Sequence, residues 1–299
     1  LATLGALDGR RPDRGFGVSV LNAADLQALQ THGISAEEAQ RQLALLASPP
    51  EPMHLERPCT VGDGILRLDA TAQAAAEARG EALLKGPRTA KFVPASGAAS
   101  RMFKDLLAAL DQVYGMPPEA VCTLLNDADR FAFHGTWKEA LGDNSDKAFN
   151  MHLADGAWQR VLQALLLQPG LDYAHAPKAF IEFHRHEGRS RTALEEHWHE
   201  AGQLPVKRLH FTVSPEHEPG FHALVGGLRP LMSFAGFGWM DLGYSFQDPA
   251  TDTLAGDGQG GPFRDDEGQL LLRPGGHGSL IRNVQALAKQ ADVVIIKNI

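Results

Sequence analysis

The segment Pro94–Met102 combines small residues with a cation in a pattern suited to binding phosphate. It reads PASGAASRM and follows the short apolar run Phe92–Val93. A turn of small residues lets backbone N–H groups approach a phosphate, and a helix N-terminus after the turn adds a favourable dipole. Arg101 stands where a guanidinium could reach phosphate oxygens. Small residues also form tight turns that bind nothing, so both interpretations stay open. The nucleotide-binding residues expected in this turn are Pro94, Ala95, Ser96, Gly97 and Ala98.

A second glycine-rich segment, RPGGHGSL, occupies residues 273–280. Its glycines surround His277 ahead of a helical pattern, which would again bring backbone close to a ligand. We expect Gly275, Gly276 and His277 to contact a base, a sugar or a phosphate. The alternative is a plain turn with a surface histidine.

Lys178 follows Pro177 and precedes the apolar run AFIEF. A lysine at the start of a strand could direct its ammonium into a site, although a lone lysine is usually a solvated surface charge.

Six histidines cluster in the second half of the chain, but their spacing does not favour zinc. No H-E-x-x-H is present, and neighbours two apart on a helix point away from each other. The segment HRHEGRSR, residues 184–191, could instead be a basic loop beside an anionic ligand. The six are His184, His186, His197, His199, His210 and His217.

Composition indicates an ordinary globular protein of 299 residues, with 43% hydrophobic and 21% charged residues. A net charge of -8 argues against a nucleic-acid-binding surface. The two distant cysteines fit a reducing cytoplasm, and no apolar run is long enough to span a bilayer. We therefore expect a cytoplasmic protein with neither nucleic acid nor membrane as partner.

The elements that would position these residues alternate between strands and helices from residue 89 onward. Residues 1–88 read as a mostly helical region with helices at about 23–32 and 36–47 and a third helix that opens at Asp69 or Thr71 and runs to about residue 84. In residues 89–299 the alternation predicts an α/β fold with a largely parallel sheet and a helical insertion at about 105–175. The glycine- and aspartate-rich stretch 254–266 is a candidate mobile loop. The expected strands cover residues 92–93, 179–183, 208–213, 243–246 and 293–297.

Taken in order, these motifs resemble sugar nucleotidyltransferases of the glycosyltransferase-A type, which have a Rossmann-like sheet. PASGAASRM looks like their first signature, Pro177-Lys178 like their second, and RPGGHG like the uridine-contacting loop of UDP-sugar pyrophosphorylases. The blocks VPASGAASRMFK, HFTVSPEH, PFRDD and RPGGHG also resemble a bacterial family that is grouped by fold with these transferases.

The resemblance implies transfer of a nucleotidyl group from a nucleoside triphosphate to a sugar phosphate, with release of pyrophosphate. Arg101 would neutralise the leaving pyrophosphate, Lys178 would neutralise the α-phosphate or the attacking phosphate, and Gln247 is a weaker candidate for a base or ribose contact. Mg²⁺ is implied as cofactor. Its aspartate ligand is expected just after Ile299, so the chain is expected to be incomplete at that end.

Two alternatives remain on the same fold. A non-catalytic nucleotide or nucleotide-sugar binding protein is suggested by the missing metal carboxylate and by Ala99, which stands where the loop usually has its second glycine. A glycosyltransferase is the other alternative and would need a D-x-D motif. Asp252 has no second aspartate at that spacing in the string Thr251–Leu254.

Overall fold

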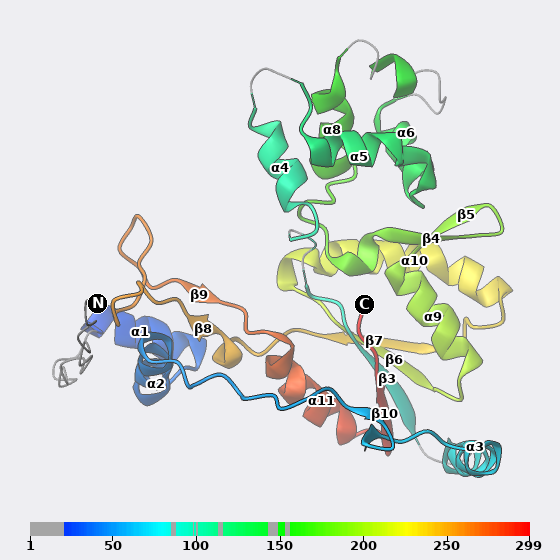
Figure 1. Ribbon diagram of the computed structural model, residues 1–299, viewed down its shortest axis with the longest axis horizontal. Coiled ribbons are helices and arrows are strands. Elements are labelled where there is room, and N and C mark those ends of the chain that lie inside the picture. Colours follow the sequence, from blue (N-terminus) through cyan, green and yellow to red (C-terminus); the bar gives the residue numbers. More distant parts are fainter. Residues whose placement is uncertain are drawn as a thin grey trace, which may run out of the picture. The chain divides into compact units, whose positions relative to one another are not determined.

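The computed structural model describes residues 21–84, 88–97, 99, 101–112, 116–142, 149–152 and 156–299 (Figure 1). Two compact units make up the chain. One consists of Leu1–Glu56 with Pro249–Gly275, and the other of Arg57–Asp248 with Gly276–Ile299. This division differs from the boundary expected near residue 88, because a later segment joins the N-terminal helices and residues 57–88 join the other unit.

In the first unit, two helices pack with a small hairpin. Helix α1, Ala23–His32, begins at Asn22, whose side chain and that of Asp25 each accept the other's backbone N–H. It ends at Gly33, where a φ of 78° favours glycine. Helix α2 spans Ala36–Ala47, and strands β8, Thr253–Leu254, and β9, Leu272–Arg273, pair antiparallel. The helices predicted here are confirmed. The core residues are Leu21, Leu29, Ile34, Ala39, Leu43 and Leu254.

The second unit contains a four-stranded parallel sheet in the order β10-β3-β6-β7. The chain passes through β3, β6 and β7 in one direction and then returns to place β10 on the other side of β3. The strand order therefore reverses between β3 and β10, and ligands of open α/β sheets bind at the carboxyl ends of the strands at such a point. The strands are β3, Thr89–Pro94, β6, Arg208–Thr212, β7, Asp241–Ser245, and β10, Val293–Ile296.

Helices cover both faces of this sheet. Ala90 and Phe92 of β3 share an apolar cluster with Leu287 of helix α11, Ile281–Ala288. The alternate residue Val93 belongs to a second cluster with Trp198 of helix α9. Helix α9 spans Ala193–Gln203, and α10, Glu218–Phe234, contributes to the same cluster. The predicted α/β architecture with a parallel sheet is thus confirmed.

One predicted strand was wrong. Residues 179–183 do not join the sheet, because Lys178–Phe180 forms a 3₁₀ turn. Strand β4, Glu182–His186, instead pairs antiparallel with β5, Arg189–Thr192, so the expected basic loop is a hairpin. Ala179 and Ile181 are buried, and a short buried apolar run has the same pattern in a turn as in a strand.

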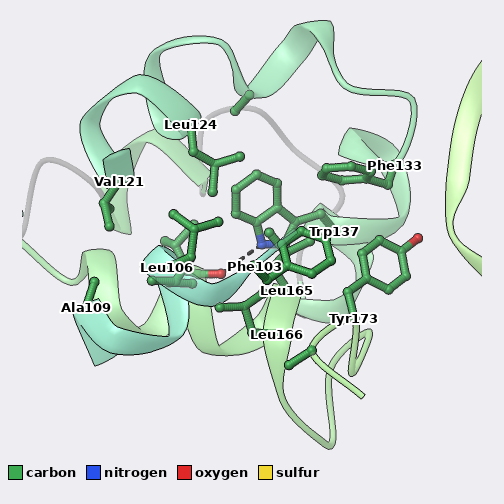
Figure 2. Close-up of a cluster of buried hydrophobic side chains, with 14 of the residues drawn as sticks. Phe103, Leu106, Ala109, Val121, Leu124, Phe133, Trp137, Leu165, Leu166 and Tyr173 are labelled. Atoms are coloured by element: carbon green, nitrogen blue, oxygen red, sulfur yellow. Dashed lines mark hydrogen bonds between the residues drawn. The ribbon is translucent and has the colours of Figure 1, made fainter. Parts of the chain in front are cut away.

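The expected helical insertion is present and has its own core (Figure 2). Trp137 is 0% exposed and donates its indole N–H to the Val161 carbonyl oxygen over 2.8 Å. The helices are α4, Lys104–Leu110, α5, Glu119–Asn126, α6, His134–Ala140, and α8, Trp158–Leu166. Three elements precede the sheet strands in the sequence: β1, Thr60–Val61, β2, Gly64–Ile65, and α3, Ala70–Leu84.

Candidate functional site

The loop that follows β3 is fixed to the end of the neighbouring strand β6. The Ala95 N–H donates to both the carbonyl oxygen and the Oγ1 of Thr212, over 3.1 and 3.2 Å. Ser214 donates its hydroxyl to the Ser96 carbonyl oxygen over 3.1 Å. Thr212 is fully buried, so this attachment belongs to the rigid sheet edge.

Two further hydrogen bonds join the same loop to the segment that ends the helical insertion. The Ala99 N–H donates to the Ala176 carbonyl oxygen, and the Lys178 N–H donates to the Gly97 carbonyl oxygen, each over 3.2 Å. Arg101 follows Ala99 by two residues. The two cations that the sequence singled out, far apart along the chain, are therefore attached to one loop at the point where the strand order reverses.

Both cations are available to an anion. Arg101 is exposed and Lys178 is half-buried. Neither side chain forms an ion pair with a carboxylate of the residues that the structure describes. Their charges can thus attract a phosphate without first breaking a salt bridge.

The backbone donors of the loop are fewer than the sequence predicted. Pro94 has no N–H, and the N–H of Ala95 is already used by Thr212, so neither can donate to a phosphate. The N–H groups of Ser96 and Gly97 reach no acceptor among the described residues. Ala98 lies outside the described residues. The loop's donors for a ligand are therefore Ser96 and Gly97.

Gly97 leaves room for such a ligand. It is exposed, its φ is not in the left-handed region, and a Cβ added to it would meet nothing within 4 Å. Neither backbone conformation nor packing against described atoms requires glycine at this position. A ligand that approaches the backbone closely would require glycine at this position.

The part of the second glycine-rich segment that begins at Gly276 meets the end of β10. His277 begins a 3₁₀ turn, His277–Leu280, and its Nε2 lies 3.2 Å from the Asn298 Oδ1. The Lys297 N–H donates to the Phe92 carbonyl oxygen over 3.1 Å, which fixes the end of β10 beside β3. His277 and Gly276 thus lie at the carboxyl end of the strand next to the loop. Gly275 is the last residue of the other compact unit and is not placed with them.

Gln247 lies at the same edge of the sheet but beyond the end of β7, two strands away from β3. Strands are spaced about 4.8 Å apart, so β7 lies roughly 10 Å from β3. Asn283 of α11 donates to the Phe246 carbonyl oxygen over 2.7 Å and so fixes this end of β7 to the helix. The structure therefore centres the site on β3 and β10, with Gln247 at its periphery.

Sequence reasoning missed Thr212, Ser214 and Asn298. The first two belong to the block HFTVSPEH, whose polar residues directly follow a buried strand, and that position was a usable signal. Asn298 follows β10 in the same way, two residues after Ile296. Polar residues just past the carboxyl ends of parallel strands gather at one edge.

The magnesium ion implied by the resemblance stays a prediction. Among the described residues, no group of three or more His, Cys, Asp or Glu side chains is placed to hold a metal ion. Asp248, the carboxylate just past β7, forms an ion pair with Arg282 at 2.7 Å. Magnesium is usually held by one or two carboxylates together with substrate phosphates.

Two of the six histidines are buried against the sheet rather than gathered at its edge. Burial, the largest cause, lowers the pKa of both His197 and His210 to about 4. Both imidazoles are therefore neutral at physiological pH. His210 Nε2 lies 2.9 Å from the Ser245 Oγ, which is a structural contact within the sheet.

Comparison with known proteins adds one finding. A family model described as "Domain of unknown function (DUF4301)" matches residues 22–299. No curated protein and no solved structure gives a significant match. Separately, none of the described helices combines the length and apolar character that a bilayer crossing needs.

Proposed function

The chain belongs to the family described as a domain of unknown function (DUF4301), and we propose that it transfers a nucleotidyl group from a nucleoside triphosphate to a sugar phosphate. The observation that supports this proposal most directly is the attachment of Lys178 and Arg101 to one loop at the switch point of a parallel sheet. The glycosyltransferase-A type of fold is part of the proposal. So is a cytoplasmic location, which the two free cysteines favour.

The proposed reaction depends on positioning and charge neutralisation. An oxygen of the sugar phosphate attacks the α-phosphorus, and the bond from that phosphorus to the bridging oxygen of the β-phosphate breaks. The electron pair of that bond leaves with pyrophosphate. The Ser96 and Gly97 N–H groups would hold a phosphate, Lys178 would neutralise the α-phosphate, and Arg101 the leaving pyrophosphate. Gly276 and His277 would contact the base or ribose.

A second candidate is a protein that binds a nucleotide or nucleotide-sugar without catalysis. The observation that favours it is that Asp248, the carboxylate just past β7, is already engaged in an ion pair with Arg282. Both candidates require the same anion site, so they differ in turnover and not in binding.

Two measurements separate these candidates. Thermal-shift screening of nucleoside triphosphates and UDP-sugars, with and without Mg²⁺, tests binding. We expect at least one triphosphate to raise the melting temperature. If no compound of the panel shifts it, both functions are contradicted. Pyrophosphate release in the presence of sugar phosphates then tests turnover. Binding without release would leave only the second candidate.

Variants connect the result to the loop. Arg101→Ala should slow pyrophosphate release. Lys289→Ala is the matched control and should leave the rate unchanged. Lys289 is an exposed cation that lies just before β10 begins, at the opposite edge of the sheet. Equal rates for wild type and Arg101→Ala would remove Arg101 from the mechanism.

A further inference from the structure

A fully buried lysine lies in the middle of β3. Lys91 is 0% exposed, and its Nζ donates to the His197 carbonyl oxygen over 3.1 Å. The same ammonium forms an ion pair with the Glu200 Oε2 at 2.5 Å. A buried charge requires a partner of this kind, because an uncompensated ammonium is strongly destabilising.

A second ammonium shares that carboxylate. The Nζ of Lys297 forms an ion pair with the other oxygen of Glu200, Oε1. Glu200 is the one carboxylate that either ammonium pairs with among the described residues, so one positive charge there is left without compensation. His197, whose Nδ1 lies 3.7 Å from the Glu200 Oε2, adds no charge, because its imidazole is neutral at physiological pH.

The two lysines are not equally held. Lys91 cannot reach solvent and must keep Glu200, whereas the Lys297 side chain is 55% exposed. An exposed ion pair contributes little to stability, so the ammonium of Lys297 can exchange its partner at small cost. Lys297 is therefore the spare cation of this cluster.

This spare cation lies at the switch point. Lys297 directly follows β10, and its N–H donates to Phe92 of β3. The loop that follows β3 begins two residues further along the sheet than Lys297. At the usual rise per residue of a strand, this separation is about 7 Å. The four-carbon stem of lysine lets its ammonium move over a distance of this order.

We propose that Lys297 is a further phosphate-binding residue, whose ammonium leaves Glu200 for a ligand phosphate while Lys91 retains the carboxylate. The inference rests on the proposed function and deepens it. With Arg101 and Lys178 it brings three cations to the site, a number that suits a diphosphate or triphosphate better than a single phosphate. Lys297 thereby makes the site selective for polyphosphates.

The test uses calorimetric titration of the full chain with pyrophosphate and, separately, with orthophosphate. We expect Lys297→Met to weaken pyrophosphate binding about tenfold, the loss of one charge-assisted contact, and orthophosphate binding much less. Lys297→Arg should restore most of the affinity. Lys289→Met, which removes the same charge at the opposite edge of the sheet, should change neither affinity.

The outcomes are distinguishable. If wild type binds pyrophosphate and Lys297→Met binds it equally well, this inference is overturned and the proposed function stands. The inference is also overturned, and the proposed function stands, if Lys297→Met weakens binding of pyrophosphate and of orthophosphate equally. Lys297 would then confer no selectivity for polyphosphates. If wild type binds neither pyrophosphate nor any nucleotide, the proposed function fails and this inference with it. An unchanged melting temperature for Lys297→Met shows that the variant is folded.

Discussion

The backbone N–H of Lys178 donates to the carbonyl oxygen of Gly97 over 3.2 Å. This bond places a residue from the end of the helical insertion beside the loop that precedes the insertion. It uses only main-chain atoms. The position of Lys178 and the charge of its side chain are therefore separable, and so are the experiments that test them.

Lys178→Met should leave the fold unchanged and weaken anion binding. The variant keeps the N–H that attaches the segment to Gly97, and its apolar stem replaces that of lysine. Pyrophosphate affinity should fall about tenfold through loss of one charge-assisted contact. Calorimetric titration measures it, with Lys289→Met as control. A large fall in melting temperature would show that the ammonium has a structural role instead.

Gly97→Ala should fold normally and bind phosphate ligands more weakly. The added methyl group enters open space, and the φ of Gly97 is one that alanine adopts. A ligand that packs against the loop would meet this methyl group. Equilibrium binding of pyrophosphate tests the prediction, and Gly226→Ala, on α10 with no atom within 4 Å of its added Cβ, is the control. Unchanged affinity would place the ligand elsewhere.

The sequence predicted the parallel sheet because its strands are apolar runs separated by helical patterns, and Arg208–Thr212 and Val293–Ile296 form as expected. It also predicted the capped helices, since Asn22 and Ser35 carry local signals. It could not predict the order of the strands. That order depends on long-range pairing between β10 and β3, for which a single chain carries no local signal.

The candidate site was predictable in part for the same reason. Ser96, Gly97 and Lys178 stand in recognisable strings, whereas the hydrogen bonds that consume the Ala95 N–H come from Thr212 on another strand. Which donors of a loop remain available is decided by tertiary partners. The loss of Ala95 as a phosphate donor could therefore be found only in the folded structure.

Trp137→Ala should destabilise the helical insertion by about 3–5 kcal/mol. The side chain is 0% exposed within the cluster of Figure 2, and its removal leaves a cavity and deletes the indole hydrogen bond to the Val161 carbonyl oxygen. Urea unfolding followed by circular dichroism measures the change. Trp239→Ala, at a residue that is 59% exposed, should cost roughly 0.5 kcal/mol or less. Similar losses for the two variants would contradict the described core.

The stability of the sheet unit should fall as pH drops from about 6.5 to 4. Burial lowers the pKa of His210 from 6.5 to about 4, so the unfolded chain binds more protons than the folded one in this interval. Stability therefore rises with pH across the interval, by on the order of 3 kcal/mol for one such group.

His210→Gln should flatten this dependence, although His197 retains a slope of its own. Urea midpoints at pH 4.5 and 7, read from tryptophan fluorescence, report on this unit, because all four tryptophans lie in it. His54→Gln, at an exposed position, should behave as wild type. An undiminished slope in His210→Gln would show that His210 is not the titrating group.

Arg264→Met should destabilise the other unit by about 3 kcal/mol. Asp25 of α1 is 4% exposed and accepts two hydrogen bonds from the Arg264 guanidinium, at 2.8 and 2.7 Å. The hydrogen bond to Arg264 is the largest cause of the lowered Asp25 pKa. The variant leaves this carboxylate buried and unpaired. Hydrogen exchange of the α1 amides measures the loss, with the exposed Arg273→Met as control.

The bond between Ala99 and Ala176 has an evolutionary consequence. Because it joins the two ends of the helical insertion, the number of residues between these ends can change without moving the loop that follows β3. Lengthening a closed loop costs little entropy, and each doubling adds only about 0.6 kcal/mol. The insertion is in this sense a separable segment of the chain. A lineage could shorten, enlarge or exchange it without rebuilding the loop that follows β3.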